Sequence, residues 1–130
     1  MFPSDSAAGP AMITFAGIMV TDPQLYSTTD GVVARFTVAA TERQCGQVAG
    51  QRMDAGPSLL PCSIGNQAAR NVAASITMGT RVLITGVLWQ REWEDTASEK
   101  RYAYEILATE VAVSLNHATV WVIQAERRPQ

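Results

Sequence analysis

The pattern that most constrains the fold is a series of strand-like segments interrupted once by a helical segment. Residues 32–41 show it best, because their apolar side chains alternate with Arg35 and Thr37 as in a half-buried strand. Other strand-like segments lie at 12–20, 58–64, 81–92 and 101–113, and a further extended segment lies at 118–123. Five strands with one helix between the third and the fourth predict an all-β OB fold, a small Greek-key barrel. Composition alone would not distinguish it from other small barrels.

The helix is predicted from an apolar stripe with helical spacing. Four residues recur at i, i+3, i+4 and i+7, namely Ala69, Val72, Ala73 and Ile76. Asn66 is a suitable N-cap residue before the stripe, and Gly79 is a suitable C′ residue after it. We therefore expect a single helix of about three turns in this part of the chain.

The length of 130 residues fits one domain. We expect residues 1–11 to be a flexible leader, residues 12–123 the OB-fold domain, and residues 124–130 a short polar tail. No run of 18 apolar residues occurs, so we expect no membrane span. The two cysteines, interpreted as reduced thiols, favour a cytoplasmic protein.

Charge and cysteine content exclude several classes of function. Ten Lys and Arg against twelve Asp and Glu give a net charge of −2, which argues mildly against a nucleic-acid partner. Cys45, Cys62 and His117 are too few for a structural zinc site, so we expect no metal and no cofactor. Reduced thiols are the preferred interpretation, and a Cys45–Cys62 bridge stays open. Without a Ser/His/Asp set or a phosphate-cradling Gly loop, we expect no enzyme.

Several motifs, in this order and spacing, resemble the bacterial single-stranded DNA-binding protein family. They include DPQL at 22–25 and GVLWQREW at 86–93, with further matches at 31–39 and 66–82, and residues 110–119 are similar to the ending of actinobacterial members. The resemblance implies a homotetramer, associated with the nucleoid, that binds and protects single-stranded DNA without sequence preference in replication, recombination or repair. Residues 124–130 do not match the family's acidic C-terminal tail, so the chain is either a truncated form or a short paralogue. Missing stacking aromatics favour the paralogue, and we expect no tail-mediated protein partners.

The candidate binding residues follow from the chemistry of a single strand, which exposes base faces and phosphates. The resemblance aligns Trp93 with a stacking tryptophan of the family. Trp89 shares its strand face and suits either DNA stacking or a subunit contact, whereas Trp121 suits an interface anchor. Candidate phosphate contacts are Arg35, Arg43, Arg52, Arg91, Lys100 and Arg101.

The chain also departs from the family pattern. Where the family places its other stacking aromatics, this chain has Gln44, Ser58 or Leu59, and Ile64 or Gly65. Four acidic residues crowd the hairpin beside Trp93, namely Glu92, Glu94, Asp95 and Glu99, and such residues are usually solvated. These departures leave a second interpretation open, an OB-fold assembly or interaction module that has lost strong DNA binding.

Overall fold

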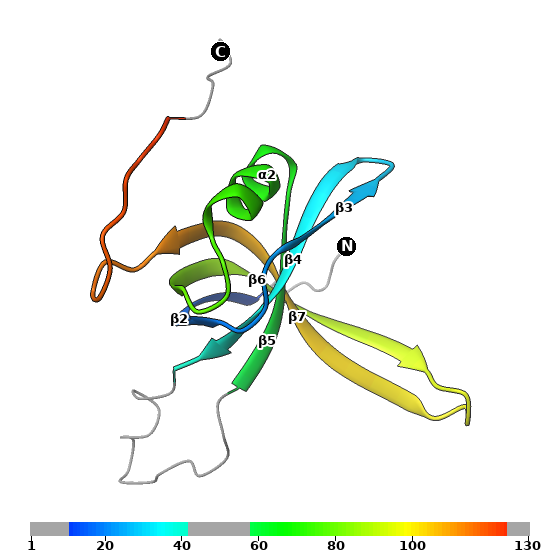
Figure 1. The fold of residues 1–130 in the computed structure, drawn as a ribbon. Coiled ribbons are helices and arrows are strands. Elements are labelled where there is room, and N and C mark those ends of the chain that lie inside the picture. Colours follow the sequence, from blue (N-terminus) through cyan, green and yellow to red (C-terminus); the bar gives the residue numbers. More distant parts are fainter. Residues whose placement is uncertain (1–10, 42–57, 125–130) are drawn as a thin grey trace, which may run out of the picture.

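The computed structural model describes residues 11–41 and 58–124. Its elements, in chain order, are strands β2 (Ala11–Met19), β3 (Gln24–Thr28), β4 (Gly31–Ala40) and β5 (Ser58–Gly65), helix α2 (Asn66–Ser75), and strands β6 (Arg81–Glu94) and β7 (Lys100–Val113) (Figure 1). All five predicted strands are present, with ends within one or two residues of the prediction. Strand β3 was not predicted.

Five of the strands close into a ring, which confirms the OB fold. The sheet order is β2-β6-β7-β5-β4-β3, and β2 also pairs with β4, which closes the ring. Both β2 and β3 lie along the same edge of β4, where Met19 is opposite Val38 and Gln24 is opposite Arg35. The segment 20–23 therefore interrupts one long edge rather than ending it, which explains the additional strand.

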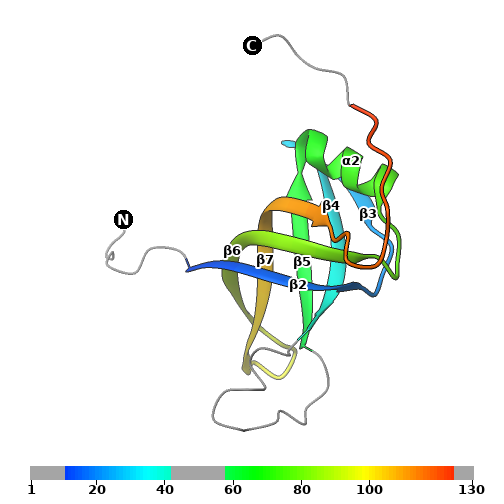
Figure 2. The ribbon, with the colours of Figure 1, turned by 90° about the vertical axis from the view of Figure 1, so that its left-hand side faces the viewer.

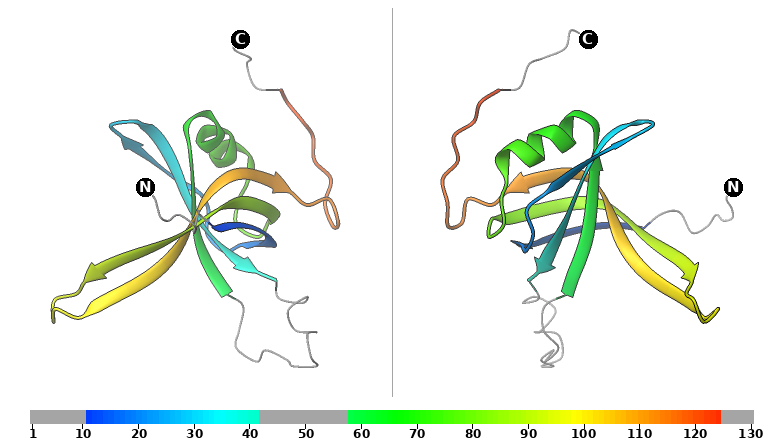
Figure 3. Two further views of the ribbon diagram at one scale, coloured as in Figure 1. Left: turned by 180° about the vertical axis from the view of Figure 1, so that it is seen from behind. Right: turned by 45° about the vertical axis from the view of Figure 1, so that its right-hand side comes forward.

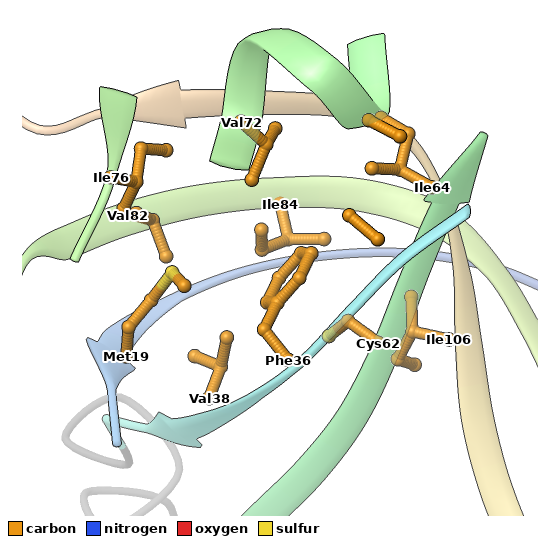
Figure 4. Close-up of a cluster of buried hydrophobic side chains, with 12 residues drawn as sticks. Met19, Phe36, Val38, Cys62, Ile64, Val72, Ile76, Val82, Ile84 and Ile106 are labelled. Carbon is orange, nitrogen blue, oxygen red and sulfur yellow. The ribbon is translucent and has the colours of Figure 1, made fainter. Parts of the chain in front are cut away.

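The core fills the ring with the apolar half of each alternating strand. Among the residues that the structure describes, twelve are buried in the core, and Val38, Ile84 and Ile106 are fully buried (Figure 4). Burying a side chain of this size stabilises the fold by about 1.5–3 kcal/mol. Helix α2 lies over one end of the ring and adds its buried Val72 to the same cluster, followed by Ile76 just past the helix end (Figures 1 and 2).

Cys62 belongs to this core. It is a free thiol, only 2% exposed, and its Sγ donates to the Leu60 carbonyl oxygen at 3.5 Å. Desolvation, with a smaller contribution from the Glu105 carboxylate, raises the pKa of Cys62 to about 12. The side chain therefore packs as a neutral group of small volume. Cys45 lies outside the described residues.

The ends of α2 differ from the prediction. The N-cap residue is Gly65, no side-chain hydrogen bond caps the helix, and Asn66 itself has a φ of +64°. The helix ends at Ser75, and the extended backbone of Ile76 follows it. Gly79 has a φ of +96°, but it lies in the next turn, where its N–H donates to the Met19 carbonyl oxygen at 2.7 Å. The assignments of Asn66 as N-cap and of Gly79 as C′ residue were therefore wrong.

The β6–β7 hairpin bends away from the barrel at Gly86. The register of the two strands shifts between Thr85 and Gly86, and a Cβ at residue 86 would collide with the Leu107 carbonyl oxygen. Only a residue without a side chain fits there, and the hairpin bends at this point. Beyond the bend the hairpin projects from the barrel (Figures 1 and 3).

After β7 the described chain continues without a strand to residue 124. Residues 118–123 run beside α2 (Figure 2). Both segments line a groove of about 670 Å³. The predicted extended segment at 118–123 is thus present as an unpaired stretch of chain. It leaves Trp121, Val122 and Ile123 exposed by 79–88%.

Candidate nucleic-acid interface

One face of the projecting hairpin carries two tryptophans. Strand alternation places Trp89, Arg91 and Trp93 on the same side of β6, and their partners across β7 are Glu105, Ala103 and Arg101. We call this side, defined by Trp89, Arg91, Trp93 and Arg101, the tryptophan face. The two indole-bearing residues are 53% and 48% exposed, so both rings can be reached by a ligand.

Glu105 links the tryptophan face to β4. Its Oε2 lies 3.5 Å from Nη2 of Arg35, and its Oε1 lies 3.6 Å from Nη1 of Arg91. The Glu105 side chain is only 14% exposed, whereas the two arginine side chains are 52% and 55% exposed. A largely covered carboxylate therefore holds two accessible guanidinium groups on one side of the sheet.

Asp95 organises the tip of the hairpin. Its Oδ1 accepts the backbone N–H groups of Ala97 and Glu99 at 2.9 and 3.0 Å, and its Oδ2 accepts Nε of Arg101 at 2.8 Å. The Glu99 N–H and then the Arg101 guanidinium hold the pKa of Asp95 below its ordinary value. Asp95 thus fixes the guanidinium that lies across the hairpin from Trp93, a role that the expectation of a solvated acidic cluster missed.

A groove of about 520 Å³ extends from the hairpin to β3. Arg35, Arg91 and Glu105 line it, and Tyr26 and Asp22 line its β3 side. We call it the central groove. Tyr26 is 50% exposed and was not among the predicted site residues, because no strand was predicted over residues 24–28. The alternation of Gln24 and Tyr26 with Leu25 was the available signal.

The other predicted residues are placed apart from this cluster. Lys100 lies on the opposite side of the hairpin, where its Nζ is 3.0 Å from Oε2 of Glu92 and where Tyr102 also lies. Trp121 lies in the segment beside α2. Arg43 and Arg52 fall outside the described residues. Within residues 11–41 and 58–124, no group of three His, Cys, Asp or Glu side chains could hold a metal ion.

A closed five-stranded barrel with aromatic rings and guanidinium groups on an outer face is the architecture of OB-fold proteins that bind nucleic acid. The model of the single-strand binding protein family matches residues 11–114 of this chain. The chain therefore belongs to the single-strand binding protein family. In the parts of the chain that the structure covers, no helix is long and apolar enough to cross a membrane.

Individual proteins show the same relationship. The chain is 42% identical over 121 residues to the single-stranded DNA-binding protein of Mycolicibacterium smegmatis. The matched region covers 92% of this chain and 73% of that protein. The chain is also 42% identical over 116 residues to single-stranded DNA-binding protein 2 of Streptomyces coelicolor, with 88% and 58% covered. The crystal structure of a small single-stranded DNA-binding protein from Streptomyces coelicolor has a similar fold. Its TM-score is 0.68 at 22% identity, over 85% of this chain and 100% of that one.

Proposed function

We propose that this chain binds single-stranded DNA without sequence preference. The observation that carries the proposal is the tryptophan face, where two half-exposed rings flank a guanidinium on one strand. Stacking on an aromatic ring contributes roughly 1–3 kcal/mol per base, and it tolerates any sequence because every base has a π-face. Membership of the single-strand binding protein family supports the same function.

Arg35, Arg91 and Arg101 would bind the phosphates. The two Glu105 ion pairs, at 3.5 and 3.6 Å, are longer than strong charge-assisted hydrogen bonds of about 2.7–2.9 Å. A phosphate oxygen can therefore replace the carboxylate as the partner of either guanidinium. The net charge of −2 does not decide the question, because the charge near these guanidinium groups can differ from the total of the chain.

The family suggests a place for this activity in DNA replication, recombination and repair. Protection of exposed single strands in those processes needs tight binding that does not depend on sequence. Stacking and phosphate contacts together meet this requirement.

We further propose that the functional unit is a homotetramer. The support is the apolar run from Val120 to Ile123, which stays exposed beside the groove along α2. Soluble monomers rarely expose a contiguous apolar patch of this kind. Light scattering at micromolar concentration should give four times the chain mass, and a monomer mass would contradict the proposal.

The binding itself is tested by titrating the protein with oligo-dT at several salt concentrations while following tryptophan fluorescence. We expect quenching and an affinity that falls with salt. Arg35→Ala and Arg91→Ala should each flatten the slope of log K against log salt by about 0.7 per lost phosphate contact. Arg70→Ala, an exposed position on α2, is the matched control and should leave the slope unchanged. No quenching and no binding at low salt would favour the OB-fold assembly or interaction module instead.

A further inference from the structure

Tyr26 stands at the end of the central groove farthest along the sheet from the hairpin. It lies on β3 opposite Val33, next to the pair of Gln24 and Arg35. Strand alternation therefore puts the Tyr26 ring on the same side of the sheet as the Arg35 guanidinium. Diagonal neighbours in an antiparallel pair are about 7–8 Å apart, within reach of an aromatic and a long side chain.

The ring has no role in the barrel itself. Among the described strands β3 pairs with β4 alone and lies outside the closed ring, and Tyr26 is half exposed rather than part of the core. Together with Arg35 and Arg91 it lines one continuous groove, and Arg91 stands between Trp89 and Trp93. The sheet therefore presents rings at both ends of a path that has two guanidinium groups between them.

The balance of charges in the groove favours a contribution to DNA binding from the Tyr26 ring. The groove is lined by two guanidinium groups, of Arg35 and Arg91, and by two carboxylates, of Glu105 and Asp22. The Asp22 Oδ1 accepts the backbone N–H of Met78 at 2.8 Å, while Glu105 faces both arginines. Because the carboxylates offset part of the positive charge, phosphate contacts alone would hold a strand weakly, and stacking adds a contribution that charge does not cancel.

We propose that Tyr26 is a base-stacking residue, and that one DNA strand runs from the tryptophan face through the central groove to Tyr26. The inference rests on the proposed function and extends it by specifying the path of the DNA strand and the residue at which that path ends.

The test compares Tyr26 variants with oligo-dT of roughly 4 to 20 nucleotides, the range of OB-fold site sizes and somewhat beyond. Tyr26→Ala should weaken binding of the longer oligonucleotides roughly 5- to 150-fold, the ratio that loss of one stacked base predicts. The shortest oligonucleotides occupy the tryptophan face alone and should show little change. Tyr26→Phe keeps the ring and should bind within about twofold of the parent chain. Tyr26→Thr removes the ring but suits a strand, so it serves if the alanine variant does not fold.

Tyr102→Ala is the matched control, because Tyr102 is 55% exposed but lies on the opposite side of the hairpin. A loss that grows with oligonucleotide length, and that the phenylalanine variant does not show, supports the inference. If Tyr26→Ala and Tyr26→Thr bind every length as tightly as the parent while Trp93→Ala binds weakly, the inference is wrong and the proposed function stands. If the parent chain binds no oligo-dT, both are wrong.

Discussion

Arg35 and Glu105 form an ion pair across a strand that lies between them. Arg35 is on β4 and Glu105 on β7, and β5 separates these strands in the sheet, yet Nη2 and Oε2 are 3.5 Å apart. The other carboxylate oxygen faces Arg91 on the hairpin. The Glu105 carboxylate therefore forms ion pairs both with the barrel strand β4 and with the projecting hairpin.

Replacing Glu105 with glutamine should strengthen DNA binding. The change removes the carboxylate that competes with phosphate for the two guanidinium groups, while keeping the shape of the side chain. We expect tighter oligo-dT binding at low salt and a steeper salt dependence, by about 0.7 in slope for each additional phosphate that the protein binds. Glu110→Gln, an exposed position farther along β7, is the control. Weaker binding by Glu105→Gln would mean that the carboxylate positions the arginines rather than competing for them.

The order of the hairpin tip should depend on pH through the protonation of Asp95. Its pKa lies below the ordinary value of 3.8 because the Glu99 N–H, and then the Arg101 guanidinium, favour the charged form. Since the folded pKa is the lower one, this contribution to the order of the tip is present at neutral pH and is lost as the pH falls through the folded pKa.

Carboxyl ¹³C NMR titrations would measure the pKa of Asp95 directly. Arg101→Ala should move it upward, towards the ordinary value. Lys100→Ala should leave it unchanged, because Lys100 pairs with Glu92. An Asp95 pKa that does not respond to Arg101→Ala would contradict the assigned contact.

The Cys62 thiol should be protected in the folded protein. Its pKa is raised to about 12 by burial and, to a smaller extent, by Glu105, and only the thiolate reacts readily. In a Cys45→Ser background we expect almost no reaction with a disulfide reagent at pH 8 until denaturant is added. Because the unfolded thiol ionises first, stability should fall as the pH rises from about 9 towards 12, and Cys62→Ala should lack this component. Equal reactivity in the folded and unfolded chain would show that residue 62 is not in the core.

The sequence predicted the barrel because its signals were local and repeated. Alternation along residues 32–41 and the glycine at 86 determine which side chains enter the core and where the hairpin bends. The helix ends were misassigned because Asn66 and Gly79 have the residue types of caps, whereas their actual conformations are determined by the turns around them. Strand β3 was missed because Asp22 and Pro23 signal a turn, and only pairing with β4 shows that the strand resumes.

The candidate site was partly predictable for the same reason. Alternation alone groups Trp89, Arg91 and Trp93, and it also separates Lys100 from them once the register of the hairpin is known. Glu105 and Tyr26 were not predicted because their roles depend on strands that are distant in the sequence. No local pattern indicates that a carboxylate on β7 will meet an arginine on β4, or that a tyrosine on β3 will line the same groove.

Substitution of Trp93 by alanine, with affinity and stability measured on the same sample, tests the central claim most directly. Trp93 is half exposed near the end of β6, so we expect oligo-dT binding to weaken by roughly 1–3 kcal/mol per stacked base while the melting temperature changes little. Tyr102→Ala, on the opposite side of the hairpin, should change neither quantity by a comparable amount. A Trp93→Ala protein that binds as tightly as the parent but melts at a clearly lower temperature would contradict the account, because Trp93 would then be part of the scaffold and not of a DNA-binding face.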